Sequence, residues 1–146
     1  MADLITAVEY VEIGSVPLAT PAFRCLNTVA ELLQSADTAG KDTVIPGAHG
    51  ARPNARWRRP TIRTLEIEIF GDRDRANTPY SNVRTGLAAN VLVLQALVTT
   101  SVTATLHYSG GTKTATVLVE GLGLAPHSPT MMRATMRICI PAGQFA

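Results

Sequence analysis

The sequence predicts a mainly β, α+β fold, an antiparallel β-sandwich or small barrel with one long flanking helix and a long irregular arm. Three observations predict it. Apolar and polar residues alternate in several segments, as in strands with one buried face. One segment, from Val83 to Val98, repeats apolar residues at steps of four and three, as in a helix. Residues 34–60 show little periodicity of either kind.

Composition indicates one folded domain whose surface is partly covered by something other than water. The chain has 146 residues, enough for a single domain, residues 1–146. Hydrophobic residues make up 46% and charged residues 16%, against roughly 25% charged residues in a typical domain. The net charge of +2 provides no bulk electrostatic case for binding nucleic acid.

The sequence also speaks against a membrane protein. No apolar run approaches the ~18 residues that a membrane span needs. The segment from Met1 to Ile5 lacks the basic start and long apolar stretch of a signal peptide. We therefore expect synthesis in a cytoplasm and no membrane partner.

The N-terminal third contains one strand signal and one ambiguous segment. Residues 10–13 could belong to a half-buried strand. In residues 23–33, Leu26, Val29, Ala30 and Leu33 fall at helical spacing. A short helix and a loop with a hydrophobic anchor remain equally open there.

Residues 34–60 form a stretch too long for an ordinary loop in a compact domain. Pro46-Gly47 is a turn signal, because glycine can supply the positive φ of a tight turn. An arginine run with Trp57 in its middle follows, and it holds five of the 13 basic residues of the chain: Arg52, Arg56, Arg58, Arg59 and Arg63. An irregular segment of this length is usually either disordered or functional.

The strand and helix after the arm carry the clearest signals. From Thr64 to Phe70, apolar residues alternate with a polar face that includes Glu66 and Glu68. These carboxylates could pair with Arg133 and Arg137 on another strand. Thr78-Pro79 fits a helix start with a threonine cap and proline in the first turn. In the helix, Leu92, Val93 and Leu97 widen the apolar face, so we expect burial on more than one side.

The last third reads as three strands, 102–108, 114–119 and 132–140. Ser109-Gly110-Gly111 predicts the turn of a hairpin. Gly121 and Gly123 predict a bend or bulge, and residues 126–129 predict a turn.

No catalytic or metal-binding set is visible. Asp72 and Asp74 sit in a turn that asparagine and aspartate favour anyway. His49 has no partner that would complete a catalytic set. Cys25 and Cys139 have no metal-ligand spacing, and we do not expect a disulfide between them. The sequence predicts no enzyme, no catalytic residue, no metal and no cofactor.

The arginine run could contact phosphates while a base stacks on Trp57. It could equally pair with carboxylates of a neighbouring subunit, since arginine and tryptophan are enriched at interfaces. Without the run the chain carries more acidic than basic residues, which favours subunit contact over nucleic acid.

The order of several short motifs resembles the small minor tail proteins of siphophages that infect actinobacteria. The resemblance covers about Val16 to Phe145, and its plan is similar to the N-terminal domain of distal tail proteins. The motifs are Gly40-Lys41-Asp42, Ile45-Pro46-Gly47, Gly50, the arginine run, the strand 64–70, Gly71-Asp72, Thr78-Pro79-Tyr80, Gly86-Leu87 with Asn90, and Ile140-Pro141-Ala142-Gly143.

The resemblance implies a structural role in the tail of a virion, a β-sandwich with a flanking helix, and assembly into a ring, commonly a hexamer. Its partners would be copies of itself and other tail proteins, such as tube, tape measure or tail-tip proteins. Tube and terminator proteins share much of this architecture, so those roles stay open. A nucleic-acid module and a receptor- or carbohydrate-binding tip module stay open too.

We expect the arm to form the subunit interface, with the alternative that it folds back on its own domain. The predicted interface residues are Ile45, Pro46, Gly47, Arg52, Arg56, Trp57, Arg58, Arg59 and Arg63.

Overall fold

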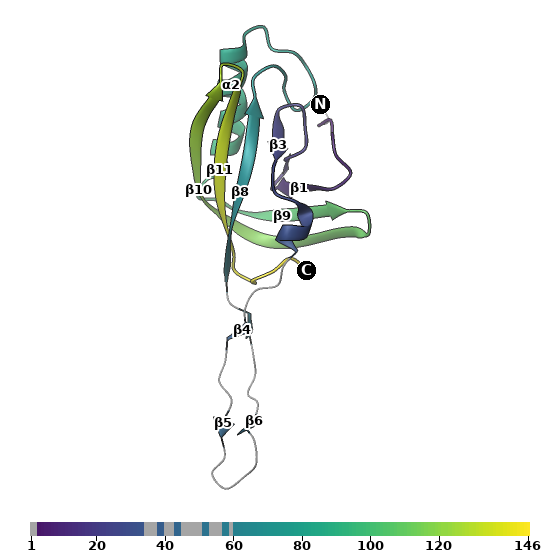
Figure 1. Cartoon of the computed structure of the whole chain (residues 1–146), viewed down its shortest axis with the longest axis vertical. Coiled ribbons are helices and arrows are strands. Elements are labelled where there is room, and N and C mark those ends of the chain that lie inside the picture. Colours follow the sequence, from purple (N-terminus) through teal and green to yellow (C-terminus); the bar gives the residue numbers. More distant parts are fainter. Residues whose placement is uncertain (1–2, 34–37, 40–42, 45–50, 53–56, 59) are drawn as a thin grey trace.

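The fold is a seven-stranded antiparallel sheet that curls into a nearly closed barrel, with few helices (Figure 1). The computed structural model describes residues 3–33, 38–39, 43–44, 51–52, 57–58 and 60–146. The strand order is β2-β1-β9-β10-β11-β8-β3. The strands are β1 (Tyr10–Ile13), β2 (Val16–Pro17), β3 (Phe23–Cys25), β8 (Thr61–Phe70), β9 (Ser101–Tyr108), β10 (Gly111–Ser128) and β11 (Met131–Ile140). The predicted mainly β, antiparallel class is confirmed.

The longest uninterrupted pairing joins β8 to β11, from Thr61 opposite Ile140 to Phe70 opposite Met131. Because side chains alternate across a strand, each of the two strands has one inner and one outer face. The inner faces contribute fully or almost fully buried residues to the core: Leu65, Ile67, Ile69, Ala134, Met136, Ile138 and Ile140. The predicted alternation of both strands is therefore confirmed.

Leu18 nearly closes the barrel between β1 and β3. Its backbone N–H donates to the carbonyl of Val11 at 2.8 Å, and its own carbonyl accepts from the N–H of Cys25 at 3.0 Å. Just after β3, α1 (Val29–Leu32) forms a single turn, capped by the Thr28 hydroxyl. The ambiguous segment 23–33 is thus part strand and part helix.

The long helix α2 (Val83–Gln95) packs its buried face against the core and lies beside β8, β10 and β11 in Figure 1. Its N-cap is Asn82, whose side-chain oxygen accepts from the N–H of Arg84 at 2.9 Å, so the predicted start at Thr78-Pro79 is wrong. The N–H of Thr78 is instead held by Asp74 in the preceding loop. Leu92 is 63% exposed, which corrects the expectation that it widens the apolar face.

The hairpins match the sequence signals with two adjustments. The first turn consists of Ser109 and Gly110, because Gly111 already pairs with Tyr108. The register between β10 and β11 shifts between Val119 and Gly121, which confirms the predicted bulge. The turn expected at 126–129 comes later, since β10 continues to Ser128.

A close contact between two glycines holds α2 against the end of β8. A Cβ added at Gly86 would collide with the backbone oxygen of Gly71 and lie 2.6 Å from the ring carbon Cδ2 of Tyr80. A Cβ added at Gly71 would lie 2.6 Å from the backbone oxygen of Val83. Both contacts involve backbone, which cannot move aside as a flexible side chain can.

We expect Gly86→Ala to destabilise the protein by about 1–3 kcal/mol, because overpacking forces the helix away from β8. Helix propensity alone predicts the opposite sign, a gain of about 1 kcal/mol. Urea unfolding followed by circular dichroism measures the difference. Gly123→Ala is the matched control, since its Cβ meets only the Thr135 oxygen at 4.0 Å. A Gly86→Ala variant as stable as the control would contradict the close contact.

Candidate subunit interface

The described parts of the arm form two short antiparallel ladders. β4 (Thr38–Ala39) pairs with β7 (Trp57–Arg58), and β5 (Thr43–Val44) pairs with β6 (Ala51–Arg52). In Figure 1, β5 and β6 lie well away from the seven-stranded sheet. The sequence predicted an irregular arm, because two-residue strands are too short to show an alternating pattern.

The predicted interface residues are only partly placed by the structure. Arg52 lies in β6, and Trp57 and Arg58 lie in β7 opposite Ala39 and Thr38. Arg63 lies in β8 and pairs with Ile138, on the inward-facing side of the strand, where it is half-buried. The remaining candidates lie outside the described residues: Ile45, Pro46, Gly47, Arg56 and Arg59.

The outer face of the sheet carries ordered opposite charges. Glu68 of β8 is opposite Arg24 of β3 on one side and Arg133 of β11 on the other. Opposite charges at directly paired positions stabilise a sheet modestly. The register thus agrees with the predicted pairing of Glu68 with Arg133, whereas Glu66 is opposite Thr135. Arg137, however, is opposite Thr64, and its ion pair is with Glu120 of β10, at 3.0 Å.

Beyond Val119, the side of β10 that faces away from β11 has no strand partner in the part of the chain that the structure describes. β9 pairs with β10 only as far as Leu118. Backbone groups of adjacent residues point to opposite sides of a strand. The N–H of Phe70 bonds to Ala22 on the β3 side, so the odd-numbered residues of β8 direct their backbone groups toward β11. Their partners in β11, such as Met136 and Ala134, direct theirs toward β8. Leu122 and Leu124, which pair with Met136 and Ala134, therefore direct their N–H and C=O groups away from β11.

This open edge of β10 carries no charged protection, and only the bulge after Val119 and Pro126 interrupt it. Residues 121–126 hold no charged side chain, and Leu124 is 37% exposed. Pro126 pairs with Met132 and has its nitrogen on the open side, where a proline removes no ladder hydrogen bond. Exposed strand edges without charge are sites of pairing with another chain.

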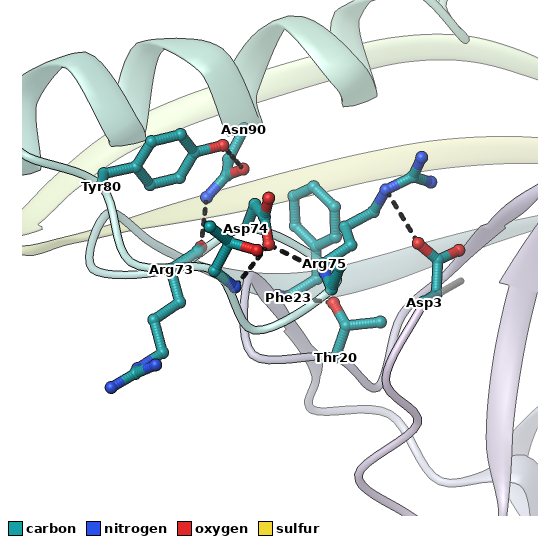
Figure 2. Close-up of polar contacts among 10 residues, drawn as sticks. Asp3, Thr20, Phe23, Arg73, Asp74, Arg75, Tyr80 and Asn90 are labelled. Carbon is teal, nitrogen blue, oxygen red and sulfur yellow. Dashed lines mark hydrogen bonds and ion pairs between the residues drawn. The ribbon is translucent and has the colours of Figure 1, made fainter. Parts of the chain in front are cut away.

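At the other end of the barrel, a polar cluster fastens the loop before α2 (Figure 2). The Asn90 side chain is 2% exposed and donates to the carbonyls of Phe70 at 2.6 Å and Arg73 at 3.1 Å. Its oxygen accepts from the Tyr80 hydroxyl at 3.1 Å. Asp74 accepts from the N–H groups of Ala76 and Thr78, as aspartate often does in turns.

The N-terminal segment is attached to the same loop, and a cavity of about 250 Å³ lies between them. The guanidinium of Arg75 lies 3.4 Å from the Asp3 carboxylate, and the N–H of Leu4 donates to the carbonyl of Arg75 at 2.8 Å. Partial burial, followed by the nearby charge of Asp74, raises the pKa of the Tyr80 hydroxyl. The polar groups of the cluster bond mainly to one another and to nearby backbone, so the cluster holds the loop before α2 and the N-terminal segment in place.

Among the described residues, no three metal-ligating side chains converge. No helix among them is long and apolar enough to cross a bilayer. Cys25 and Cys139 are both free thiols.

We expect Tyr80→Phe to lower the free energy of unfolding at pH 7 by about 1 kcal/mol, because it leaves the buried Asn90 oxygen without its donor. Because the pKa of Tyr80 is raised in the folded protein, the neutral phenol stabilises the folded state at pH values below 10.0, the ordinary pKa of tyrosine. This contribution is lost as pH rises through the folded pKa. Urea unfolding at pH 7 and at steps above pH 9 measures both effects. The variant should lose less stability than the wild type at alkaline pH, while Tyr108→Phe should behave like the wild type throughout.

Comparisons with known proteins find similarity in fold but not in sequence. No protein-family model matches the chain, and no curated protein sequence matches it. The fold is similar to the crystal structure of the Dit protein of phage SPP1, described as a paradigm of the hub adsorption apparatus in phages that infect Gram-positive bacteria. The TM-score is 0.51 at 12% identity, over 94% of this chain and 51% of that one. The chain therefore spans about half the length of the Dit protein and shares its fold.

Proposed function

We propose that the chain is a structural subunit of a bacteriophage tail, a minor or distal tail protein that assembles with copies of itself into a ring around the tail axis. The observation that carries the proposal is the likeness of almost the whole chain to the Dit protein. The motif order from Val16 to Phe145 leads independently to the same class of protein. The role is mechanical and needs no catalytic residue, metal or cofactor.

Two properties of the fold support assembly. A charged share of 16% suits a protein with buried subunit contacts, whose central parts are depleted in charged residues. The open edge of β10 offers backbone donors and acceptors at Leu122 and Leu124 to a strand of another copy. A contact between two different surfaces repeats head to tail and closes into a ring when the rotation permits.

The arm is the second proposed contact. Its outer ladder, β5 with β6, lies away from the sheet, as an element that reaches a neighbour would (Figure 1). The interface would comprise Ile45 to Arg63, with arginines forming bidentate pairs with carboxylates of the neighbour. The resemblance suggests a hexamer, with tube, tape measure or tail-tip proteins as further partners and the virion tail as the location.

Nucleic-acid binding by the arginine run is the competing function. The specific observation in its favour is Trp57 among arginines, which suits base stacking beside phosphate contacts. Such binding would weaken steeply with salt. Retention of a labelled DNA fragment at low salt, lost at high salt, would favour this function over subunit contact.

We expect purified wild-type protein to form a discrete oligomer, because the β10 edge and the arm both need a partner. Multi-angle light scattering over a range of concentrations, at low and high salt, measures the mass. Replacing residues 38–58 by a short Gly-Ser linker should shift the protein to monomers, since it removes the arm and leaves the barrel intact. Circular dichroism should show the same strand content in both proteins. A wild-type chain that stays monomeric at high concentration would contradict self-assembly.

A further inference from the structure

Most carboxylates on the described surface already have a partner. Glu120 pairs with Arg137 at 3.0 Å, and Glu12 lies 3.7 Å from His107. Asp3 pairs with Arg75, Asp74 accepts two backbone N–H groups, and Glu68 is flanked by Arg24 and Arg133. These groups are already occupied in holding the fold together.

Glu31 and Glu66 differ, because both contact the Asn27 side chain, Glu31 through its carboxylate and Glu66 through its backbone N–H, and neither has an ion pair among the described residues. The Asn27 side chain donates to Oε2 of Glu31 at 3.2 Å, and its oxygen accepts from the N–H of Glu66 at 2.7 Å. Both glutamates are exposed. Burial raises the pKa of the nearby Cys25 thiol, and the charges of Glu31 and Glu66 raise it further, against the lowering effect of a backbone hydrogen bond at Asn27.

Apolar surface lies beside these carboxylates. Leu26 is 37% exposed, and its N–H donates to the carbonyl of Glu66 at 2.8 Å. Leu33, at the end of α1, is also 37% exposed. We call the surface formed by Leu26, Asn27, Glu31 and Glu66 the acidic edge. A ligand that suits it carries positive charges next to a large apolar group.

The arm has this composition, with Trp57 between Arg56 and Arg58 and with Arg52 and Arg59 close by in the sequence. We propose that the acidic edge of one copy receives the arginine arm of a neighbouring copy, with guanidinium groups on Glu31 and Glu66 and the indole against Leu26. The proposal rests on the assembly proposed above and names the surface that the arm contacts. Arginine suits this contact because its planar group binds carboxylates bidentately and is weakly hydrated.

The path of the arm favours a neighbour over its own acidic edge. Within one chain, β5 pairs with β6 away from the sheet (Figure 1), whereas the acidic edge lies around Asn27, between β3 and α1, where it bonds to Glu31 and to the N–H of Glu66 in β8. Arg52, in β6, is therefore placed to contact another copy. The positive charge of the arm and the unpaired negative charge of the edge then neutralise each other across the contact.

Charge exchange tests the proposal. Glu31→Lys with Glu66→Lys reverses the edge, and Arg52→Glu with Arg58→Glu reverses the charge of the arm. We expect each double variant to raise the concentration for half-assembly by at least about tenfold in light scattering. A chain with all four changes should assemble within about threefold of the wild type, because the charges are complementary again. Asp72→Lys, at an exposed acidic residue in the loop after β8, is the control and should assemble like the wild type.

The outcomes separate this proposal from the tail function. If the wild type assembles and the edge variant assembles equally well, the acidic edge is not the docking surface, while the ring proposal stands. If each double variant fails and the four-change chain fails too, the arm and the edge do not contact each other, and the proposal is overturned. A monomeric wild type would overturn self-assembly and this inference with it. Thermal unfolding of every variant identifies any failure to fold.

Discussion

The complete pairing of β8 with β11 is the constraint on which the other elements depend. Every residue of β8 has a partner in β11, so one register decides which side chains of both strands enter the core. A slip by one residue would turn Leu65, Ile67 and Ile69 outward and turn Glu66 and Glu68 into the apolar core. Burying unpaired carboxylates costs several kcal/mol each, which makes this register strongly preferred.

The two ends of β8 position the arm and the helix α2. At its N-terminal end the arm joins the barrel through Pro60 and Thr61. At its C-terminal end Gly71 contacts Gly86, which positions α2 and the polar cluster around Asn90. Between these ends, the outer face of β8 carries Glu68, opposite Arg24 and Arg133, and Glu66 of the acidic edge. The register that packs the inner face of β8 therefore also fixes the positions of these surface charges.

Sequence reasoning was most successful where an alternating or helical pattern ran through many residues. The inner faces of β8 and β11 and the existence of α2 followed from periodicity. The glycine at 121 indicated the bulge, because glycine in a strand often marks one. The start of α2 was missed because Asp74 and Asp72 hold Thr78 and Tyr80 in a loop through local hydrogen bonds, which the spacing of apolar residues does not reveal.

The surfaces proposed for assembly were only partly within reach of the sequence. The arginine run singled out the arm, but the ladders β4–β7 and β5–β6 are too short to produce a pattern. The open edge of β10 depends on where β9 leaves it, and the acidic edge depends on Asn27 bringing Glu31 to Glu66. Residues far apart in the chain meet at these places only after the barrel has formed.

Electron microscopy of the purified protein, with image averages of single particles, tests the central claim most directly. The account predicts closed annular particles with a central opening and one dominant rotational symmetry, because heterologous contacts through the arm and the β10 edge repeat around an axis. Uniform particles the size of one chain, at concentrations far above those of the light-scattering series, would contradict the proposed role as a self-assembling ring of the tail.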